Sequence, residues 1–346
     1  MADKPKTLDE IMKEMNKKSE EKVVQFGITE YDFSRIPFTS PRLNYMLFGG
    51  LPQDKLIEFY GEEHGGKTTS ALDAIANYQN LDNAKKVLYV DAENTLDVEW
   101  ARKIGVDVDA MIVFKPTSHS AEEIFQFILD MIQTGEIGFV VIDSLGVMVS
   151  AQALDKSVED KTYAGISQAL TNFSNKAEMY CHKNHCTVVG INQQRDDMNA
   201  MWAGATKTPG GRAWKHACAV RLQFTRGSFI DEKGNEIKRS SETPAGNIVL
   251  VEMTKNKTCP PTRRKGFYTI TYEYGVDYIA DLIELAIKYD VIDKSGSWFS
   301  ILNPETGEEL AKLQGQASVR EFLDDEKNVE VLSMIEDYID QQMQMN

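Results

Sequence analysis

Cysteine, long apolar runs and positive charge are all in short supply in this chain. Only 4 of its 346 residues are cysteine, too few for a disulfide framework, so a reducing cytoplasm is the expected environment. No apolar stretch approaches the roughly 20 residues that a membrane-spanning helix needs, and the first residues are charged and amphipathic rather than a secretory signal. We therefore expect no membrane partner.

The deficit of positive charge is unevenly distributed. The chain has 38 lysines and arginines against 53 acids, for a net charge of −15, and such a surface on average repels a polyanion. Residues 255–265 nevertheless contain five basic residues and no acid, whereas residues 320–346 contain eight acids and two bases. A polyanionic partner would therefore have to bind at a local basic patch.

Residues 61–68, GEEHGGKT, fit the phosphate-loop pattern G-x-x-x-x-G-K-[ST] at every fixed position. In such a loop backbone N–H groups surround phosphate oxygens, Lys67 places a charge beside the β- and γ-phosphates, and Thr68 offers a hydroxyl to Mg²⁺. A strand pattern at 56–60 and a helical pattern at 69–76 flank it, so a helix N-terminus points at the nucleotide. These flanks disfavour the alternative, a chance glycine-rich turn. The predicted nucleoside-triphosphate loop comprises Gly61, Glu62, Glu63, His64, Gly65, Gly66, Lys67, Thr68 and Thr69.

Apolar runs alternate with helical periodicity from residue 36 to about 278, which predicts an α/β core. The earlier strands are continuous apolar runs and indicate a mainly parallel sheet covered on both faces. The later strands follow one another through short turns and are expected to be antiparallel. Strands are predicted at 87–90, Met111–Phe114, 139–142, 187–191, 219–224, 248–253 and 267–272, and helices at Ala121–Gln133 and 166–183.

Two smaller regions flank this core, which gives a predicted division into residues 1–35, 36–278 and 279–346. In the first, Leu8, Ile11, Met12 and Met15 recur at helical spacing and predict one amphipathic helix. That helix packs either on its own domain or on a neighbouring subunit, and the pattern does not decide between them. In the last, helical patterns at 279–289 and about 328–342 predict a small C-terminal domain.

Two predicted strand ends carry carboxylates suited to nucleotide chemistry. The apolar run 139–142 leads directly into Asp143, where a phosphate loop needs a carboxylate for the Mg²⁺ shell. The predicted metal ligands are therefore Thr68 and Asp143. Asp91 and Glu93 follow another strand and share one face of an extended segment. They are candidates for orienting or deprotonating a water, although two solvated loop acids would fit the spacing equally well.

Seven motifs in this chain resemble those of the bacterial RecA recombinases in order and spacing. They are the phosphate loop, DAENTLD at 91–97, WARK at 100–103, INQ at 191–193, GG at 210–211, KNK at 255–257 and YG at 274–275. The resemblance extends from about residue 36 to the end. It implies a RecA-like P-loop ATPase core with a twisted, mainly parallel sheet, an N-terminal helix and a small α/β C-terminal domain. The length and the lack of a long acidic tail resemble a divergent or phage-encoded member, and imply a bacterial cell or phage-infected host.

The resemblance also implies roles for individual residues around the nucleotide. Glu93 would activate water, and Gln193 would sense the γ-phosphate and relay its presence to the segment that follows. Adenine contacts are implied for Asp97, Trp100 and Tyr274, and the large ring of a tryptophan suits stacking. Lys255 and Lys257 would reach the ATP of a neighbouring subunit and act as an arginine finger does. Lys67, Glu93, Gln193, Lys255 and Lys257 are thus the implied catalytic set.

The segment 195–212 is polar, glycine-rich and too long for an ordinary connection. Taken alone, it could be a surface loop anchored by its few hydrophobic side chains. The resemblance identifies it as the second DNA-binding loop and 154–164 as the first, and implies cationic contacts to phosphates. The implied DNA-binding residues are Tyr163, Arg195, Met198, Lys207, Gly210, Gly211 and Arg212. Asp196, Asp197 and Gln168 depart from the family pattern and are expected to weaken phosphate binding.

The function implied by this resemblance is DNA-dependent ATP hydrolysis by a recombinase that uses ATP and Mg²⁺. Helical filaments of the protein on single-stranded DNA would pair that strand with homologous duplex in recombination and repair, with single-strand-binding or mediator proteins as further partners. A ring-forming ATPase of the same core and a non-enzymatic regulator are the alternatives. The segment CHKNHC at 181–186 has four potential zinc ligands, but i, i+4 pairs on two faces of a helix would not surround one ion.

Overall fold

The computed structural model describes residues 6–17, 24, 33–154, 166–196, 206–238 and 243–345. The chain divides into two units, Met1–Ser34 and Arg35–Asn346. The first contains helix α1 (Leu8–Lys17), which covers the predicted amphipathic pattern. Its first turn carries acids and its last turn a lysine, which complements the helix dipole.

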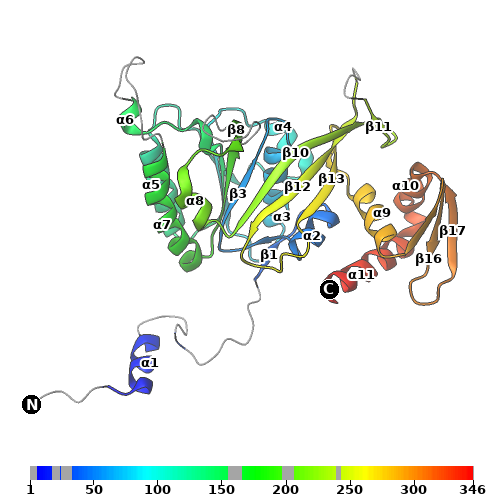
Figure 1. Cartoon of the computed structure of the whole chain (residues 1–346), viewed down its shortest axis with the longest axis horizontal. Helices are drawn as coiled ribbons and strands as arrows, with labels where there is room; N and C mark the ends of the chain where they lie inside the picture. Colours follow the sequence, from blue (N-terminus) through cyan, green and yellow to red (C-terminus); the bar gives the residue numbers. More distant parts are fainter. Residues whose placement is uncertain are drawn as a thin grey trace, which may run out of the picture. The chain divides into compact units, whose positions relative to one another are not determined.

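A ten-stranded sheet forms the centre of the larger unit (Figure 1). Its strands lie in the order β14-β13-β12-β10-β3-β7-β6-β4-β5, and β11 pairs with β10 outside this order. Every residue of β3 and of β6 is buried, as continuous apolar patterns predict for strands covered on both faces. The strands are β3 (Leu56–Gly61), β4 (Lys86–Asp91), β5 (Met111–Phe114), β6 (Ile137–Asp143), β7 (Thr187–Gln193), β10 (Val220–Ile230), β11 (Glu236–Ile237), β12 (Gly246–Asn256), β13 (Lys265–Thr271) and β14 (Gly275–Val276).

The sheet combines a parallel and an antiparallel part, and β10 belongs to both. Strands β3, β7, β6, β4 and β5 run parallel to their neighbours, and β12, β13 and β14 pair in antiparallel fashion, as expected. Strand β10 is antiparallel to β12, as expected for the later strands, but it also runs parallel to β3 on its other side. The reason is that helix α8 (Gly211–Ala217) precedes β10 and returns the chain to the edge where the parallel strands begin.

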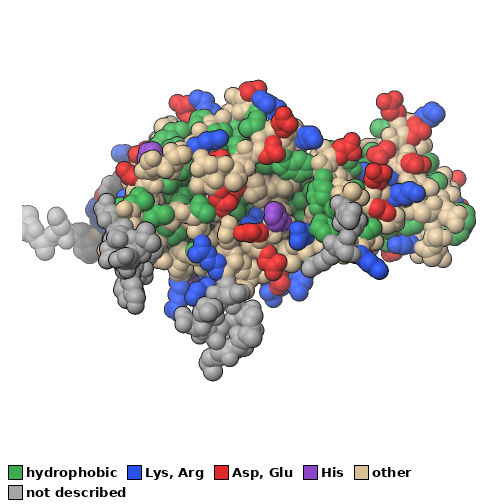
Figure 2. Space-filling view, turned by 90° about the horizontal axis from the view of Figure 1, so that it is seen from above, with side chains coloured by type: hydrophobic (Ala, Val, Ile, Leu, Met, Phe, Trp, Pro, Cys, Tyr) green, Lys and Arg blue, Asp and Glu red, His purple; other side chains and the backbone are tan. Residues whose placement is uncertain are grey.

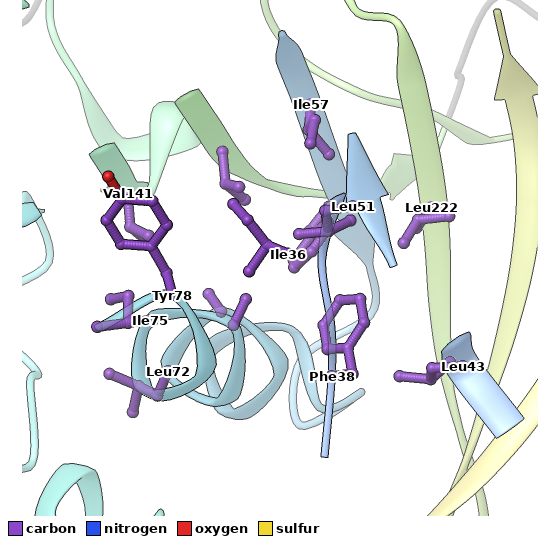
Figure 3. Close-up of a cluster of buried hydrophobic side chains, with 14 of the residues drawn as sticks. Ile36, Phe38, Leu43, Leu51, Ile57, Leu72, Ile75, Tyr78, Val141 and Leu222 are labelled. Carbon is purple, nitrogen blue, oxygen red and sulfur yellow. The ribbon is translucent and has the colours of Figure 1, made fainter. Parts of the chain in front are cut away.

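Helices cover both faces of the sheet and create two separate apolar layers. On one face lie α2 (Pro41–Leu47), α3 (Lys67–Gln79) and α4 (Val98–Ile104), and on the other α5 (Ala121–Gln133), α7 (Ser167–Asn184) and α8. Leu72, Ile75 and Tyr78 of α3 belong to one apolar layer with Ile36 and Val141, and Figure 3 shows the Tyr78 ring beside Val141. Each large apolar side chain buried in this way stabilises the fold by about 1.5–3 kcal/mol. The helix that follows the phosphate loop is therefore fixed firmly to the sheet.

The C-terminal part of this unit has an apolar cluster of its own. A three-stranded antiparallel sheet packs with three helices around Leu282, Ile301 and Ile335, among others. Its elements are α9 (Tyr278–Lys288), β15 (Ile292–Ser295), β16 (Trp298–Leu302), β17 (Glu309–Gln314), α10 (Gln316–Asp324) and α11 (Val329–Met345).

Five short elements and two 3₁₀ helices, η1 (Leu145–Val147) and η2 (Glu326–Asn328), complete the assignment. The five short elements are β1 (Arg35–Ile36), β2 (Leu51–Pro52), α6 (Ala151–Leu154), β8 (Arg195–Asp196) and β9 (Thr206–Lys207). β1 pairs with β2, and β8 pairs with β9. Across the described ranges, no helix is long and apolar enough to cross a membrane.

The two edges of the sheet carry different groups. β3, β6 and β7 end at Gly61, Asp143 and Gln193, so their last residues lie at one edge. The connection from β12 to β13, residues 257–264, lies at the opposite edge, because β12 runs antiparallel to β10 and therefore to β3. Ligands of open α/β sheets bind beyond the carboxyl ends of the parallel strands, so the first edge is the place to look for a site.

Candidate functional site

The phosphate loop joins the end of β3 to the start of α3. Gly66 is the N-cap of α3 and has a φ of 94°. A Cβ at this glycine would lie 2.9 Å from a methyl carbon of Val249, so no larger residue fits without displacement. Backbone N–H groups at the start of α3 lack helical partners and face the loop interior. The loop therefore has the geometry of an anion cradle.

Lys67 lies inside this loop. Its Nζ donates to the carbonyl oxygens of Gly61 at 3.2 Å and Glu62 at 2.6 Å, and its side chain is only 8% exposed. Burial lowers the pKa of Lys67, although Asp143 and Glu93 act in the opposite direction. A phosphate group in the cradle would favour the charged ammonium form.

Thr68 and Asp143, the predicted metal ligands, are in contact. The Thr68 hydroxyl donates to Asp143 Oδ2 at 2.8 Å, and the Tyr89 hydroxyl donates to the same oxygen at 2.9 Å. Burial raises the pKa of Asp143 above its usual range, while these two hydrogen bonds oppose the rise. A hydroxyl and a carboxylate are oxygen donors of the kind that Mg²⁺ prefers.

Glu93 and Gln193 also meet at this edge. Gln193 Nε2 donates to Glu93 Oε1 at 3.3 Å, and the hydroxyl of Ser144 donates to the same carboxylate oxygen. Ser144 is fully buried, whereas Glu93 and Gln193 are half-buried. The sequence motifs did not point to Ser144, although its position directly after Asp143 could have done so. The two groups expected to act on water and to sense the γ-phosphate therefore share one contact.

Asp91, the other acid of the pair, has a structural role. It is buried, and its oxygens accept from the backbone N–H groups of Thr95 at 3.0 Å and Leu96 at 3.2 Å. These bonds fix the turn that carries Glu93. The spacing left the choice between the two carboxylates open, and the geometry favours Glu93 as the group that faces the loop.

A pocket of about 420 Å³ extends from the phosphate loop and is wide enough for a nucleotide. Trp100 lines it, as expected for a stacking residue, and its indole N–H donates to the Thr69 hydroxyl at 3.4 Å. Tyr272 lines it too, and its hydroxyl donates to Asn247 Oδ1 at 3.1 Å. The sequence reasoning missed Tyr272, Asn247 and Arg226, which come from the antiparallel strands and their turns. The lining residues are His64, Gly65, Gly66, Lys67, Thr68, Thr69, Trp100, Arg226, Asn247, Ile270 and Tyr272.

Asp97 and Tyr274, the other two expected adenine contacts, make hydrogen bonds within the protein, and their contact with the base stays a prediction. Tyr274 bonds to Arg320 and Asp277, with its hydroxyl 3.3 Å from Asp277 Oδ2 and 2.6 Å from Arg320 Nη2. It thus links the end of the large sheet to helix α10. The Asp97 side chain caps α4 by accepting from the Trp100 backbone N–H at 3.0 Å. The structure therefore places Tyr272, two residues before Tyr274, at the pocket.

Lys255 and Lys257 lie toward the opposite edge of the sheet from the phosphate loop. The ammonium of Lys255 donates to the carbonyl oxygens of Lys215 at 2.6 Å and His216 at 2.8 Å, and Lys257 donates to His216 at 3.0 Å. Burial lowers the pKa of Lys255, and the charge of Lys257 adds to this effect. Both cations therefore bind the last carbonyls of α8, and neither approaches the nucleotide pocket of its own subunit.

The structure describes five of the seven predicted DNA-binding residues. Tyr163 and Met198 lie outside the described residues, as does Asp197. Arg195 is exposed and pairs with Lys207 in the β8–β9 ladder, and its guanidinium donates to the Gly146 carbonyl at 3.2 Å. The exposed residues Gly211 and Arg212 begin α8. These residues all lie at the edge where the parallel strands end.

Gly210 has a steric role of its own. Its φ is 97°, and a Cβ there would lie 2.4 Å from Leu170 Cδ2 of α7. Close packing of α8 against α7 therefore requires glycine at this position.

On the face seen in Figure 2, acidic and basic side chains are interspersed. A polyanion at this face would thus meet local cations rather than a uniform basic field.

The segment 181–186 does not gather its four candidate zinc ligands. Cys181 and Cys186 are buried, whereas His182 and His185 are exposed. The Nδ1 atom of His185 lies 2.9 Å from Asp54 Oδ2. In the part of the chain that the structure describes, no three His, Cys, Asp or Glu side chains are grouped to hold a metal ion.

Comparison with known proteins agrees with the motifs. A model of the RecA N-terminal domain matches residues 5–277, and a model of the RecA C-terminal domain matches residues 280–344. Protein RecA of Clostridium tetani is 33% identical over 291 residues, which cover 84% of this chain and 77% of that protein. For Bacillus licheniformis Protein RecA the identity is 30% over 342 residues, which cover 98% and 92% of the two chains.

A crystal structure of the RadB recombinase aligns with a TM-score of 0.49 and 19% identity over 68% of this chain and 96% of that one. That similarity is too low to bear on function. The family models span most of the chain, and the relatives match over most of their own length. The chain therefore belongs to the RecA family of recombinases, DNA-dependent ATPases that assemble on DNA and act in recombination and repair.

Proposed function

We propose that this protein hydrolyses ATP at sites completed by neighbouring subunits of a helical filament on single-stranded DNA, and that the filament pairs this strand with homologous duplex. The contact between Glu93 and Gln193 carries the proposal. It joins the group suited to activating water to the strand end that leads into the DNA segment. A carboxylate at this place can accept a proton from an attacking water.

ATP would lie with its phosphates in the loop 61–69 and its base in the adjoining pocket. Lys67 would neutralise charge on the phosphates, and backbone N–H groups at the start of α3 would hold their oxygens. Trp100 and Tyr272 present aromatic rings to the same pocket. Stacking on such rings suits a purine base.

Mg²⁺ is the metal that fits the donor set. Thr68 and Asp143 would hold it, because their oxygens already lie within 2.8 Å of each other. When bound, the ion supplies positive charge that offsets charge on the phosphates. A cation there would also favour the ionised form of Asp143, whose pKa burial raises in its absence.

Lys255 and Lys257 would serve the nucleotide of the adjacent subunit. Their position away from their own phosphate loop supports this assignment, since a head-to-tail contact joins two different surfaces of neighbouring subunits. Two cations placed there would stabilise charge on the transferring phosphoryl group. To do so, they must release the carbonyls of Lys215 and His216.

DNA and nucleotide would be coupled through the residues that follow Gln193. The side chain of the next residue, Gln194, donates to the Thr206 hydroxyl, and Arg195 pairs with Lys207. These contacts join the two described ends of the proposed DNA segment directly after Gln193. Any such coupling is reciprocal, so DNA should tighten ATP binding by the factor by which ATP tightens DNA binding.

The remaining assignments concern the organisation and partners of the chain. Residues 1–35 would supply an oligomerisation helix, 36–278 the ATPase core and 279–346 a small C-terminal domain. Single-stranded DNA, homologous duplex and further copies of the chain are the proposed partners in the cytoplasm. Single-strand-binding or mediator proteins would assist loading.

Two measurements test this function. ATP turnover should rise strongly when single-stranded DNA is added, and a strand-exchange assay should give product with homologous but not with non-homologous duplex. An ATP turnover that does not change when DNA is added would favour a non-enzymatic regulator. Closed hexamers in electron micrographs with ATP and single-stranded DNA would favour a ring-forming ATPase instead.

A further inference from the structure

Two buried hydroxyl groups lie directly behind the phosphate loop. Ser70 of α3 is 1% exposed, and Tyr268 of β13 is fully buried. Their hydroxyls share a hydrogen bond. Neither residue belongs to the predicted site, and neither lines the nucleotide pocket. Apolar residues of the same shape could fill this place in an apolar layer about equally well, so the presence of two polar groups needs an explanation.

The Ser70 hydroxyl also reaches the loop itself. It donates to the Gly66 carbonyl oxygen at 2.8 Å, and the Ser70 backbone N–H donates to the same oxygen at 2.9 Å. A serine hydroxyl has only one proton to donate. Because that proton is used on Gly66, Tyr268 must be the donor in the bond that the two hydroxyls share. Burial raises the pKa of the Tyr268 hydroxyl far above its usual value, so it remains a donor at neutral pH.

The two hydroxyls thus form a directed chain that ends on the Gly66 carbonyl. This carbonyl and the N–H of Lys67 belong to one peptide unit, and they point in opposite directions because the bond is trans. A carbonyl held from the side of α3 therefore aims the Lys67 N–H into the cradle, where phosphate oxygens would lie. Hydrogen bonds to the carbonyl also polarise the peptide unit and strengthen its N–H as a donor.

Rigid elements hold Tyr268 in this place. Tyr268 pairs with Val249 of β12, and the side chains of both lie against the turn at Gly66. A Cβ built on Gly66 would lie 2.9 Å from a methyl carbon of Val249 and 3.3 Å from the Tyr268 hydroxyl. The next residue of β13, Thr269, donates its N–H to Asp281 of α9 at 3.2 Å. The position of the hydroxyl is therefore set by packed strands and helices.

The same strand also contributes to the far end of the nucleotide pocket. Side chains at alternate positions of a strand share a face, and Tyr268, Ile270 and Tyr272 follow one another at this spacing. Ile270 and Tyr272 line the pocket beside the loop. One stretch of backbone thus carries both the ring proposed to stack on the base and the hydroxyl that reaches the phosphate loop. Their separation is fixed by the strand.

We propose that Tyr268 and Ser70 are positioning residues for phosphate recognition, which hold the Gly66–Lys67 peptide so that its N–H binds a phosphate oxygen of the nucleotide. This inference rests on the proposed function, in which the loop 61–69 holds the phosphates of ATP. It gives two residues that do not touch the nucleotide a measurable share in its affinity. That share depends on the phosphates and is independent of the base.

The alternative is that the hydroxyl pair only packs β13 against α3. In that case its removal would loosen the whole pocket and weaken the binding of base and phosphates alike. A positioning role predicts a loss that is confined to ligands with phosphates. The two roles can be separated because Ser70→Ala together with Tyr268→Phe leaves neither hydroxyl without its partner, and such paired removal is nearly neutral for stability.

The test measures the affinities of ADP and adenosine, each by displacement of a fluorescent ATP analogue from the full-length protein without DNA. The test variant combines Ser70→Ala with Tyr268→Phe. The control variant combines Ser174→Ala with Tyr78→Phe, and so deletes two other buried hydroxyls. Ser174 donates to a carbonyl four residues earlier in α7, as Ser70 does in α3, and Tyr78 lies in the last turn of α3. Any effect of lost stability on binding would appear in the control variant too.

The test variant should bind ADP about 10-fold more weakly than the wild type, as loss of one hydrogen bond to a charged group predicts. It should bind adenosine as the wild type does. Tyr268→Phe alone should weaken ADP binding by about 3-fold, because the Ser70 hydroxyl still donates to Gly66. Unchanged ADP affinity in the test variant would overturn the inference. So would an equal loss for ADP and adenosine, or a loss of ADP affinity of the same size in the control variant.

The wild-type protein keeps this inference separable from the proposed function. It should bind ADP much more tightly than adenosine, because the loop is proposed to hold phosphates. Equal affinities of the wild type for the two ligands would refute that placement of the nucleotide. A preference for ADP that the test variant keeps in full would refute only the role of Tyr268 and Ser70.

Discussion

Gln193 Nε2 lies 3.3 Å from Glu93 Oε1, and the Ser144 hydroxyl donates to the same oxygen. The ends of β7 and β6 therefore hold one carboxylate that follows the end of β4. A carboxylate held in this way is pre-oriented, but one of its oxygens is already engaged. In the role proposed for Glu93, its capacity to act on water would depend on where the Gln193 side chain lies, and Gln193 precedes the segment proposed to bind DNA.

Substitution of Glu93 by alanine should abolish turnover without abolishing binding. Loss of a positioned general base costs about 10²–10⁴-fold in rate, whereas Lys67, Thr68 and the pocket remain intact. Turnover and the binding of a fluorescent ATP analogue, each measured with single-stranded DNA, would check this. Normal hydrolysis by Glu93→Ala would show that another group activates water.

Ser144→Ala should lower kcat about 10-fold, as loss of one hydrogen bond to a charged group predicts. Because Ser144 positions Glu93 rather than touching substrate, the affinity for ATP should not change, while the pH profile of kcat should shift. Ser120→Ala, which removes a helix cap far from the site, is the matched control. Equal kinetics in the two variants would leave Ser144 without a role in positioning.

Mutations of Tyr272 and of Tyr274 should have different effects on ATP binding. Tyr272→Ala removes a ring from the nucleotide pocket and should weaken ATP binding by about 10-fold or more, the usual cost of a lost base–aromatic stack. Tyr274→Phe removes the hydroxyl that bonds to Arg320 and Asp277, and should leave ATP affinity unchanged. Equilibrium titration with a fluorescent ATP analogue measures both. A larger loss in Tyr274→Phe would restore the sequence-based assignment.

Tyr272 and Tyr274 illustrate which features of the site could be predicted from the sequence and which could not. Helix Ala121–Gln133 and strand Met111–Phe114 were predicted at their observed bounds, because clean periodicity and a cap or turn at each end determine such elements. The contact between Thr68 and Asp143 followed from the rule that parallel strands end at one edge. The positions of side chains on antiparallel strands were harder to predict from the sequence. A shift of two residues along a strand keeps a side chain on the same face, so only the register of β13 and β14 places Tyr272 at the pocket.

Contacts between distant segments were not visible in the sequence at all. Lys255 and Lys257 read as charges on a hairpin, and their bonds to the end of α8 depend on the pairing of β10 with β12. The strands β15, β16 and β17 are short and largely exposed, with weak alternation, and went unassigned. A small sheet of this kind is specified by its packing on α9 and α10 more than by its own pattern.

Asp281 should make stability depend on pH. It is fully buried, accepts from the Ser40 hydroxyl at 2.5 Å and from the Thr269 N–H at 3.2 Å, and burial raises its pKa to about 8. The folded state thus keeps a proton that the unfolded state has lost. The stabilisation is fully present below about pH 4 and is lost as pH rises through 8, with a slope of up to about 1.4 kcal/mol per pH unit.

Urea unfolding between pH 6.5 and 8.5 would measure this slope above the pKa of about 6 that burial gives Asp73. Asp281→Asn should flatten it, so the variant gains stability relative to wild type as pH rises. Asp324→Asn, at a half-exposed carboxylate, should not change it. Parallel curves for all three proteins would contradict the assignment to Asp281.

Mixing two inactive variants should restore activity if the lysines act between subunits. Lys67→Ala lacks a working nucleotide loop, and Lys255→Ala with Lys257→Ala lacks the cations for its neighbour. In a random one-to-one filament about a quarter of the interfaces combine an intact loop with intact lysines, so turnover should recover to about that fraction. No recovery above the two separate activities would show that the lysines act within their own subunit.

Lys255 and Lys257 sit on the far side of the sheet from the phosphate loop of the same chain, and this separation has a consequence for polymer ends. If Lys255 and Lys257 serve the neighbour's nucleotide as proposed, one terminal nucleotide of an open head-to-tail polymer has no lysines beside it, and one terminal lysine pair has no nucleotide to serve. A polymer of n subunits then has n − 1 complete sites. Short polymers should turn over less ATP per subunit than long ones, and the nucleotide at one tip should outlive all the others. The geometry of the subunit alone would thus give the polymer one end that keeps its bound ATP.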